Sequence, residues 1–278
     1  MKRLSFSTLG ALVLGCVLVQ HAYAQFGSEP AKLSVVKLQD DLVVIHNEFV
    51  PGNTTALITN QGVILVDDKF EIDHDNIIKM LKTVTNQPVK YVINTHHHAD
   101  HSGGNAKLQA EGTLAVASVN ARARMIEGKQ SGLPDITVQP RGALYLGGKT
   151  VEIYWLGRGH TDGDVVAIVD DTGVLFAGDL VEQSGPPAFG DDSYPLDWPE
   201  AVAEILHAEP RLIVPGHGAP VDTGFVAAQH ARLAEFAWLI REGHADGATP
   251  DAVAARAPWP AEACRTGVER GFLSLDAP

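Results

Sequence analysis

Cysteine is nearly absent from this chain of 278 residues, which contains only Cys16 and Cys264. Cys16 lies in an apolar stretch that has the form of an export signal, so Cys264 is expected to be the single cysteine of the processed chain. A single cysteine cannot form an intramolecular disulfide, and Cys264 has no partner for a CxxC motif. We therefore expect Cys264 to be a buried, unreactive thiol.

Positive charge is also scarce, because 21 Lys and Arg residues stand against 34 Asp and Glu residues, a formal net charge of −13. Removal of residues 1–24 takes away Lys2 and Arg3 and no acid, which brings the net charge to −15. Such a surface repels nucleic-acid phosphates and is not attracted to anionic lipid. The expected partner is therefore a small-molecule substrate, with no nucleic acid and no membrane after signal cleavage. The oligomeric state stays open.

The sequence has no apolar run of the roughly 20 residues that a membrane-spanning helix needs. The apolar run at residues 9–19 follows the basic residues Lys2 and Arg3 and precedes Ala22-Tyr23-Ala24, a small-x-small cleavage site. Residues 1–24 are thus predicted to be a cleaved export signal, and the protein is predicted to be periplasmic or secreted.

Short apolar runs separated by turn residues predict two sets of strands, and stretches of helical periodicity lie between and after them. Two sheets packed on each other with helices outside would bury such strands, which indicates an α/β (α+β) fold in one catalytic domain, residues 25–222. Residues 223–278 are predicted to be a helical segment packed on that domain. The expected strands are 33–38, 42–46, 54–59, 63–66, 89–94, 113–117, 150–155, 165–169, 174–177 and 212–214. The expected helices are 73–85, 104–111, 118–128, 198–208 and 223–242, with a long loop over 183–198.

A dense group of metal-binding side chains follows the apolar run at residues 91–94. Four histidines and one aspartate lie within residues 96–101. Neutral imidazole and carboxylate are the usual nitrogen and oxygen ligands of zinc and related ions. The loop at the end of a strand is also where sites in α/β sheets are usually built. We therefore expect a metal site here, with His97 turned away from the ligands in a structural role or in support of them.

Three more candidate ligands each follow an apolar strand. His160 lies in a loop flanked by Gly157, Gly159 and Gly163, Asp179 follows Gly178, and His217 lies between Gly216 and Gly218. A lone histidine after a strand is more often structural than a ligand, but three such placements beside the histidine-rich run favour a shared metal site.

The run His96-x-His98-x-Asp100-His101, followed in order by His160, Asp179 and His217, resembles the metallo-β-lactamase fold superfamily over about residues 33 to 222. The resemblance implies a four-layer αββα sandwich with a metal site at one edge of the sheets. It implies that His96, His98 and His160 bind a first zinc ion, that Asp100, His101 and His217 bind a second, and that Asp179 bridges both. It also places a supporting carboxylate at Asp67.

These ligands fit hydrolysis by metal-activated water. Asp100 and Asp179 supply two negative charges for two dications, and the residual positive charge would lower the pKa of a bound water. We assign catalytic roles to Asp100, which could orient that water or accept its proton, and to His160 at the first ion. The predicted function is a dinuclear zinc hydrolase that cleaves the C–N, C–O or C–S acyl bond of a small molecule: a β-lactam, lactone, ester or thioester.

Some positions depart from the most studied zinc β-lactamases. Those enzymes carry Cys or Ser where this chain has Asp179, and the Cys enzymes carry a Lys where this chain has Glu182. A carboxylate there should repel a substrate carboxylate. The stretch of residues 95–105 resembles glyoxalase II more closely, yet residues 223–278 hold five Arg and no Lys, without an obvious clamp for glutathione.

The same donors are compatible with iron or manganese. Two alternatives to the hydrolase therefore remain: an iron-dependent sulfur oxidoreductase similar to persulfide dioxygenases, and a non-catalytic periplasmic metal-binding accessory factor. Retention of His101 and His217 favours two metals over the mononuclear iron alternative.

Overall fold

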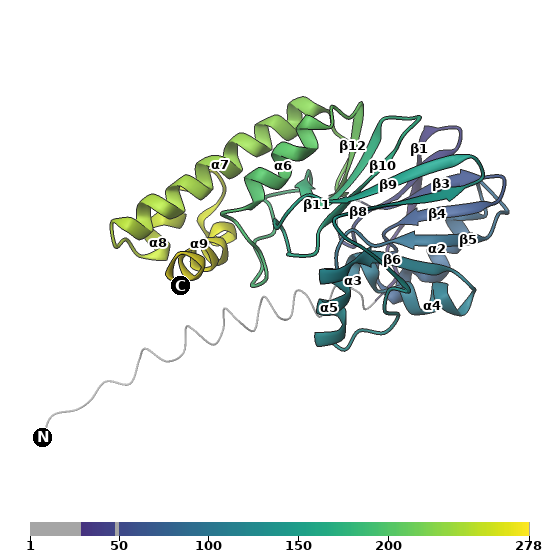
Figure 1. Ribbon diagram of the computed structural model, residues 1–278, viewed down its shortest axis with the longest axis horizontal. Coiled ribbons are helices and arrows are strands. Elements are labelled where there is room, and N and C mark those ends of the chain that lie inside the picture. Colours follow the sequence, from purple (N-terminus) through teal and green to yellow (C-terminus); the bar gives the residue numbers. More distant parts are fainter. Residues whose placement is uncertain (1–28, 48–49, 278) are drawn as a thin grey trace, which may run out of the picture.

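The computed structural model describes residues 29–47 and 50–277. The predicted export signal, residues 1–24, lies outside the described residues. In the part that is described, the strands form two mixed sheets of seven and five strands. Figure 1 shows the two sheets side by side, with α2–α5 against the first sheet and α6–α9 beside the second. This arrangement is the αββα sandwich that the sequence predicts.

The first sheet follows the order of the chain from β1 to β7. Its first four strands are antiparallel neighbours, and β4, β5, β6 and β7 are parallel. The parallel strands are connected through helices, which bring the chain back to the same end of the sheet. The strands are β1 (Ser34–Gln39), β2 (Leu42–His46), β3 (Thr54–Thr59), β4 (Gly62–Val66), β5 (Val89–Ile93), β6 (Leu114–Ser118) and β7 (Ile136–Val138).

The second sheet has the order β12-β11-β10-β9-β8, with a parallel pair only between β11 and β12. Its strands are β8 (Arg141–Leu146), β9 (Lys149–Trp155), β10 (Val165–Val169), β11 (Val174–Glu182) and β12 (Leu212–His217). The helical elements are η1 (Glu71–Asp73), α2 (His74–Leu81), α3 (Ala99–Ser102), α4 (Asn105–Ala110), α5 (Val119–Glu127), α6 (Trp198–His207), α7 (Thr223–Ala245), α8 (Pro250–Ala254) and α9 (Ala261–Asp276).

Burial on both faces explains why the strands read as continuous apolar runs. In β4, Ile64 and Val66 pack in the core between the two sheets, whereas Val63 and Leu65 face the layer that includes α2 and α4. Successive side chains of a strand point to opposite faces, so a strand covered on both faces is apolar at every position.

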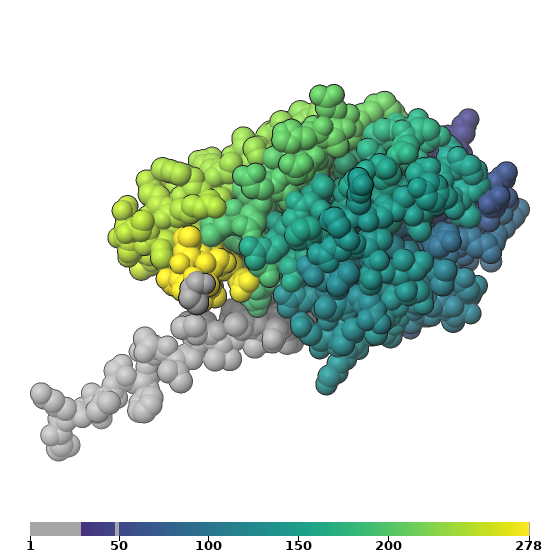
Figure 2. All heavy atoms as spheres, in the orientation of Figure 1, coloured from purple at the N-terminus to yellow at the C-terminus, as the bar shows by residue number. Residues whose placement is uncertain are grey.

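A third core joins the second sheet to the helices at the end of the chain. Trp198 of α6 and Leu180 of β11 share it with Phe236 of α7 and Val268 of α9. In the space-filling view the yellow-green C-terminal helices continue the same solid body as the green and teal segments (Figure 2). No helix among the described residues is both long and apolar enough to span a bilayer.

The structure corrects several predicted boundaries. Residues 99–102 form the short helix α3 rather than a loop, and the sequence prediction missed β7 and β8. The strand predicted over 174–177 continues through Glu182 as β11. At Gly178 its pairing with β12 shifts register, and the strand is not broken there. Gly178 has a φ of +53°, which glycine adopts at little cost.

Candidate metal centre

The seven predicted ligands come from four places in the chain and meet in one cluster. His96, His98, Asp100 and His101 follow β5, and His160 follows β9. His217 ends β12. Asp179 lies inside β11 and not at its end, which corrects the sequence prediction. Groups of these side chains place one nitrogen or oxygen each within 4.8 Å of the others, so all seven are brought together.

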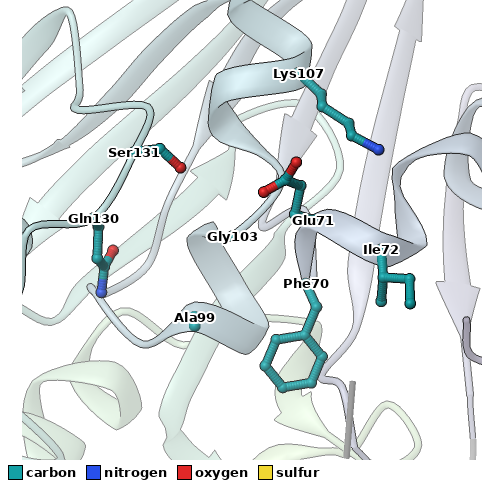
Figure 3. Close-up of a pocket in the computed structure, with 8 residues that line it drawn as sticks. All are labelled: Phe70, Glu71, Ile72, Ala99, Gly103, Lys107, Gln130 and Ser131. Carbon is teal, nitrogen blue, oxygen red and sulfur yellow. The ribbon is translucent and has the colours of Figure 1, made fainter. Parts of the chain in front are cut away.

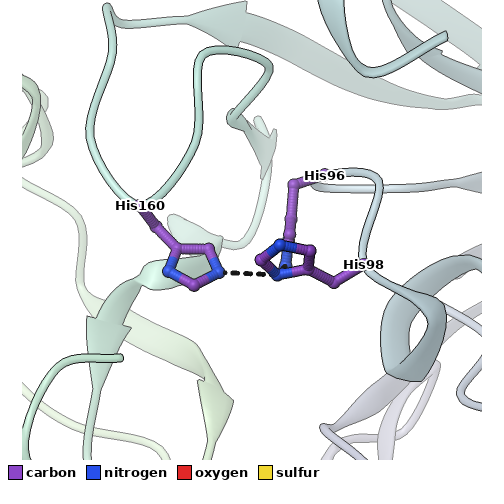
Figure 4. A group of neighbouring side chains, drawn as sticks. All are labelled: His96, His98 and His160. Carbon is purple, nitrogen blue, oxygen red and sulfur yellow. Dashed lines mark hydrogen bonds between the residues drawn. The ribbon is translucent and has the colours of Figure 1, made fainter. Parts of the chain in front are cut away.

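The three imidazoles of His96, His98 and His160 face one another (Figure 4). Nδ1 of His98 lies 3.1 Å from Nε2 of His96 and 2.9 Å from Nε2 of His160. Four ligands held at about 2.0–2.1 Å from a tetrahedral zinc ion would lie roughly 3.4 Å apart. The His98 nitrogen is therefore about as close to the other two nitrogens as the ligands of one zinc ion are to one another.

Hydrogen bonds on the far side of each ring set which nitrogen faces the cluster. His160 Nδ1 lies 3.1 Å from the Ala188 carbonyl oxygen, and His98 Nε2 lies 3.0 Å from Asp192 Oδ2. Both outer nitrogens must donate a hydrogen. His96 Nδ1 donates to Thr95 Oγ1, whose own hydrogen goes to Asp67. Each neutral ring therefore turns a bare lone pair inward, and such a triad suits a cation.

The electrostatic environment keeps two of these rings neutral. Burial, together with the neighbouring imidazoles, lowers the pKa of His96 well below its usual value. Burial also lowers the pKa of His160 to about 4. Asp192 outweighs the effect of burial at His98 and raises its pKa. Near neutral pH, His96 and His160 are thus in the state that binds a metal.

A second group consists of Asp100, His101 and His217. The Nε2 atoms of His101 and His217 are 3.2 Å apart, and Asp100 Oδ2 lies 3.5 Å and 3.4 Å from them. Burial alone would lower the pKa of both histidines, but the surrounding carboxylates, Asp179 above all, raise it, for His217 to about 10. This group therefore attracts positive charge, which a divalent cation would supply.

Asp179 lies between the two groups. Its Oδ2 is 3.5 Å from Nε2 of His160 and 3.4 Å from Nε2 of His217. Its Oδ1 is buried and lies 3.3 Å from Nε2 of His101, yet it makes no hydrogen bond. A buried carboxylate oxygen without a donor is costly unless a cation satisfies it. The donor set and this orphaned oxygen together fit a pair of divalent ions.

The supporting carboxylate Asp67 lies where the sequence resemblance implies. Its Oδ2 accepts a hydrogen from His101 Nδ1 at 2.9 Å, and its Oδ1 accepts one from the Thr95 backbone at 2.7 Å. Asp67 therefore fixes the ring of His101 with Nε2 toward the cluster and ties it to the start of the ligand run.

Sequence reasoning missed Asp192, because it lies in the long loop after β11 where no periodicity or motif marks it. Its Oδ2 lies 3.0 Å from His98 Nε2 and 3.1 Å from His97 Nε2. The ring of His97 lies 4.6 Å from that of His98, so it is turned away less fully than predicted, but its contact with Asp192 fits the predicted supporting role. The two histidines and Asp192 connect the loop to the ligand run.

Glu182 is a further buried carboxylate beside the second group. One of its oxygens lies within 4.8 Å of ligand atoms of Asp179 and His217. Its Oε1 accepts hydrogens from the backbone and hydroxyl of Ser184 at 2.8 and 2.6 Å. Burial and then the nearby Asp179 raise its pKa. The wall of the site next to His217 thus carries two carboxyl groups, those of Glu182 and Asp179.

A cavity of about 610 Å³ lies against the helix that carries Asp100 and His101. Figure 3 shows Ala99 of α3 and Gly103, which follows that helix, together with Phe70 and Glu71. None of the seven ligands lines this cavity. The cavity therefore lies next to the segment that carries Asp100 and His101, and not at the ligand cluster itself.

Comparison with known proteins adds independent findings. A sequence model described as the metallo-beta-lactamase superfamily matches residues 47–217, a range that contains all seven ligands. The metallo-beta-lactamase type 2 of Bacillus cereus is 29% identical over 197 residues, which cover 69% of this chain and 76% of that protein. Metallo-beta-lactamase IND-1 of Chryseobacterium indologenes is 30% identical over 216 residues, with coverage of 74% and 89%.

Solved structures give the same result for the fold. A metallo-beta-lactamase from Pontibacter korlensis has a TM-score of 0.66 and 26% identity, and the match covers 73% of this chain and 99% of that one. The DIM-1 metallo-beta-lactamase has a TM-score of 0.65 at 20% identity, with coverage of 75% and 100%. At that identity the likeness concerns the fold alone.

Proposed function

The chain belongs to the metallo-β-lactamase superfamily and is a metal-dependent hydrolase, and on this premise we propose that it is a dinuclear zinc enzyme. Its substrate would be a small molecule with a β-lactam, lactone, ester or thioester bond. The observation that carries the proposal is the convergence of two ligand groups on Asp179, whose Oδ2 lies within 3.5 Å of both His160 and His217.

We assign His96, His98 and His160 to the first ion and Asp100, His101 and His217 to the second, with Asp179 shared. Bound zinc would polarise the scissile carbonyl and lower the pKa of water. The tautomers of His96, His98 and His160 support this assignment, because each turns a lone pair inward. The three carboxylates around His101 support the second ion.

Asp100 is proposed to orient the attacking water or to accept its proton. Its side chain is 20% exposed, more than that of Asp179 at 7%, so it can reach a water at the mouth of the site. Burial would raise the pKa of Asp100, but His101 and His217 outweigh burial and lower it well below its usual value. Asp100 therefore stays ionised near neutral pH and can accept a hydrogen bond from water.

The acidic wall at Glu182 bears on substrate choice. A substrate carboxylate placed beside His217 would meet Glu182 as well as Asp179, and like charges repel one another. Lactones, esters and thioesters without a carboxylate at this point suit the site better than penicillins, so we expect β-lactam turnover to be weak.

The mononuclear iron alternative is disfavoured by the second group. An enzyme with a single ion does not need His101 and His217 placed with Nε2 atoms 3.2 Å apart beside Asp100. Export, to the periplasm or out of the cell, remains part of the proposal and rests on the sequence of residues 1–24. Amino-terminal sequencing of the protein from the periplasmic fraction should begin at Gln25.

Metal analysis tests the proposal directly. The purified protein should bind two zinc ions at saturation, and it should hydrolyse at least one class in a panel of lactones, esters, thioesters and nitrocefin. Asp100→Ala should keep the fold and the first ion while turnover falls by at least a hundredfold. Binding of fewer than two ions would contradict the dinuclear proposal. Tight binding without any turnover would instead support the accessory-factor alternative.

A further inference from the structure

Lys69, which follows β4, is completely buried. Its Nζ donates to Asn47 Oδ1 at 3.0 Å and to the backbone carbonyl of Gly52. Lysine is almost never fully buried, because its charge loses hydration there. An apolar side chain would fill the same space without that cost. A lysine at this position therefore provides one thing that an apolar residue would not: the two hydrogen bonds from Nζ.

Gly52 and Asn53, which we call the spacer, contact the ring of His101 and the backbone on either side of His217. A Cβ on Gly52 would be 2.5 Å from Cε1 of His101 and 2.7 Å from the carbonyl oxygen of Gly216. Gly52 thus lies against both the ring of His101 and the backbone carbonyl of the residue before His217. Only a glycine leaves enough room for this contact.

Asn53 fixes the spacer to the strand that carries His217. Its backbone N–H donates to the Gly216 carbonyl at 2.6 Å. Its Nδ2 donates to the carbonyls of Pro215 and Gly218, both at 2.9 Å. The backbone on both sides of His217 is therefore bonded to the spacer, and the other side of the spacer is bonded to Lys69.

We propose that Lys69 is a positioning residue of the second metal group: through the Gly52 carbonyl it holds the spacer, which sets the separation of His101 and His217. This inference rests on the proposed two-metal site. A protonated amine has three N–H groups and a neutral amine has two, so either form can satisfy both acceptors. The positioning therefore does not depend on the charge of Lys69.

The test compares the parental protein with Lys69→Met, which keeps the length and apolar stem of the side chain but removes its N–H groups. Lys79→Met, at an exposed position of α2, is the matched control. Stepwise zinc affinities are measured by competition with a chromophoric chelator, and the site geometry is followed by the absorption spectrum of the cobalt(II)-loaded protein.

We expect Lys69→Met to bind the second ion at least about tenfold more weakly, with the affinity for the first ion unchanged and an altered spectrum for the second cobalt ion. Lys79→Met should match the parental protein. Equal weakening at both sites would mean a general structural role and would overturn the proposal, as would two parental affinities. A parental protein that binds one ion would instead contradict the dinuclear function.

Asn53→Ala provides a second route to the same conclusion if Lys69→Met does not fold. It removes the bonds to Pro215 and Gly218 but leaves Lys69 in place. Circular dichroism establishes that the variant is folded, and we expect the same selective weakening of the second ion. A folded Asn53→Ala protein with parental affinity for both ions would show that the spacer does not set the site.

Discussion

At the scale of single residues, Gly216 makes room for the shared carboxylate. A Cβ built on Gly216 would overlap Oδ1 of Asp179 and would also lie 2.8 Å from the backbone of Gly178. Neither neighbour can move away easily, because Asp179 is held within a strand and lies beside three histidines. The side chain of Asp179 therefore occupies space that only glycine leaves free.

Gly216→Ala should consequently displace Asp179 and impair both metal sites. We expect metal affinity to fall by at least about tenfold at each site, and hydrolysis to fall with it. Gly185→Ala is the matched control, since no atom lies within 4 Å of a Cβ at that position. Equilibrium dialysis against zinc measures the effect, and parental binding by Gly216→Ala would contradict the steric argument.

Lys69 gives a pH-dependent prediction for the metal-free protein. Burial lowers the pKa of Lys69 from 10.5 to about 7, so between these values the unfolded chain binds a proton that the folded protein lacks. The free energy of unfolding should therefore rise with pH across this window, by up to about 1.4 kcal/mol per pH unit.

Lys69→Met should lack this contribution. Urea unfolding of both metal-free proteins at pH 7, 8 and 9 isolates it, because the other titrating groups are common to both. As the pH rises, the free energy of unfolding of the parental protein should increase relative to that of Lys69→Met. A difference that stays constant over this range would mean that Lys69 titrates near its ordinary pKa.

The convergence of the seven candidate ligands could be predicted from the sequence, because the histidine-rich run, His160, Asp179 and His217 each follow an apolar run of strand length. The residues that orient them could not. Asp192, Gly216 and Lys69 act through contacts with residues far away in the chain, and each has an ordinary structural explanation when seen alone in the sequence. A buried lysine in particular looks like any surface lysine until its environment is known.

At the scale of elements, the loop between β11 and α6 is part of the first metal group. Asp192 of this loop accepts hydrogen bonds from the outer nitrogens of His97 and His98, and the Ala188 carbonyl accepts one from His160. Two of the three first-group rings are thus oriented by one irregular segment. Its sequence predicted a loop near the site but gave no sign of these contacts.

Asp192→Asn should weaken the first ion selectively. The amide keeps the shape of the side chain, but it loses the negative charge that holds His98 Nε2–H, so Nδ1 becomes a poorer ligand. We expect the affinity for the first zinc ion to fall about tenfold to a hundredfold, with a smaller effect on the second. Asp191→Asn, at the exposed neighbouring position, is the control. Equal loss at both sites in the chelator competition would contradict this assignment.

The boundaries of β11 show why strand prediction failed near the site. The sequence reads as a strand up to residue 177 because Gly178 and Asp179 interrupt the apolar pattern. In the structure Gly178 takes a φ of +53°, its backbone approaches Thr95, and the strand continues through Glu182. A polar residue inside a strand breaks the local pattern because it serves the metal site rather than the core.

At the scale of the whole molecule, the two packed sheets could be predicted because apolar runs of strand length need cover on both faces. The helices that cover each sheet could not be assigned, since sequence periodicity does not tell which helix packs on which sheet. The structure places α7 and α9 against α6 and β11, in one shared apolar core. Residues 223–278 therefore contribute to the same core as the strands that carry Asp179 and His217.

This packing predicts that residues 25–222 do not fold without the C-terminal helices. Removal of residues 223–278 would expose Leu180, Trp198 and Ile213 and would delete Phe236 and the other apolar side chains of α7–α9 that pack on them. Each such side chain contributes about 1.5–3 kcal/mol when buried, so the loss of five would match the total stability of roughly 5–15 kcal/mol of an ordinary domain.

The comparison uses three chains that begin at Gln25 and end at residue 278, 272 or 222. The chain ending at residue 272 loses mainly exposed residues and should melt cooperatively close to the full-length chain. The chain ending at residue 222 should be insoluble, or should lack a cooperative thermal transition and bind no zinc tightly. A soluble 25–222 chain with a cooperative transition and two bound ions would show that the catalytic domain folds alone, and that the C-terminal helices are an accessory to it.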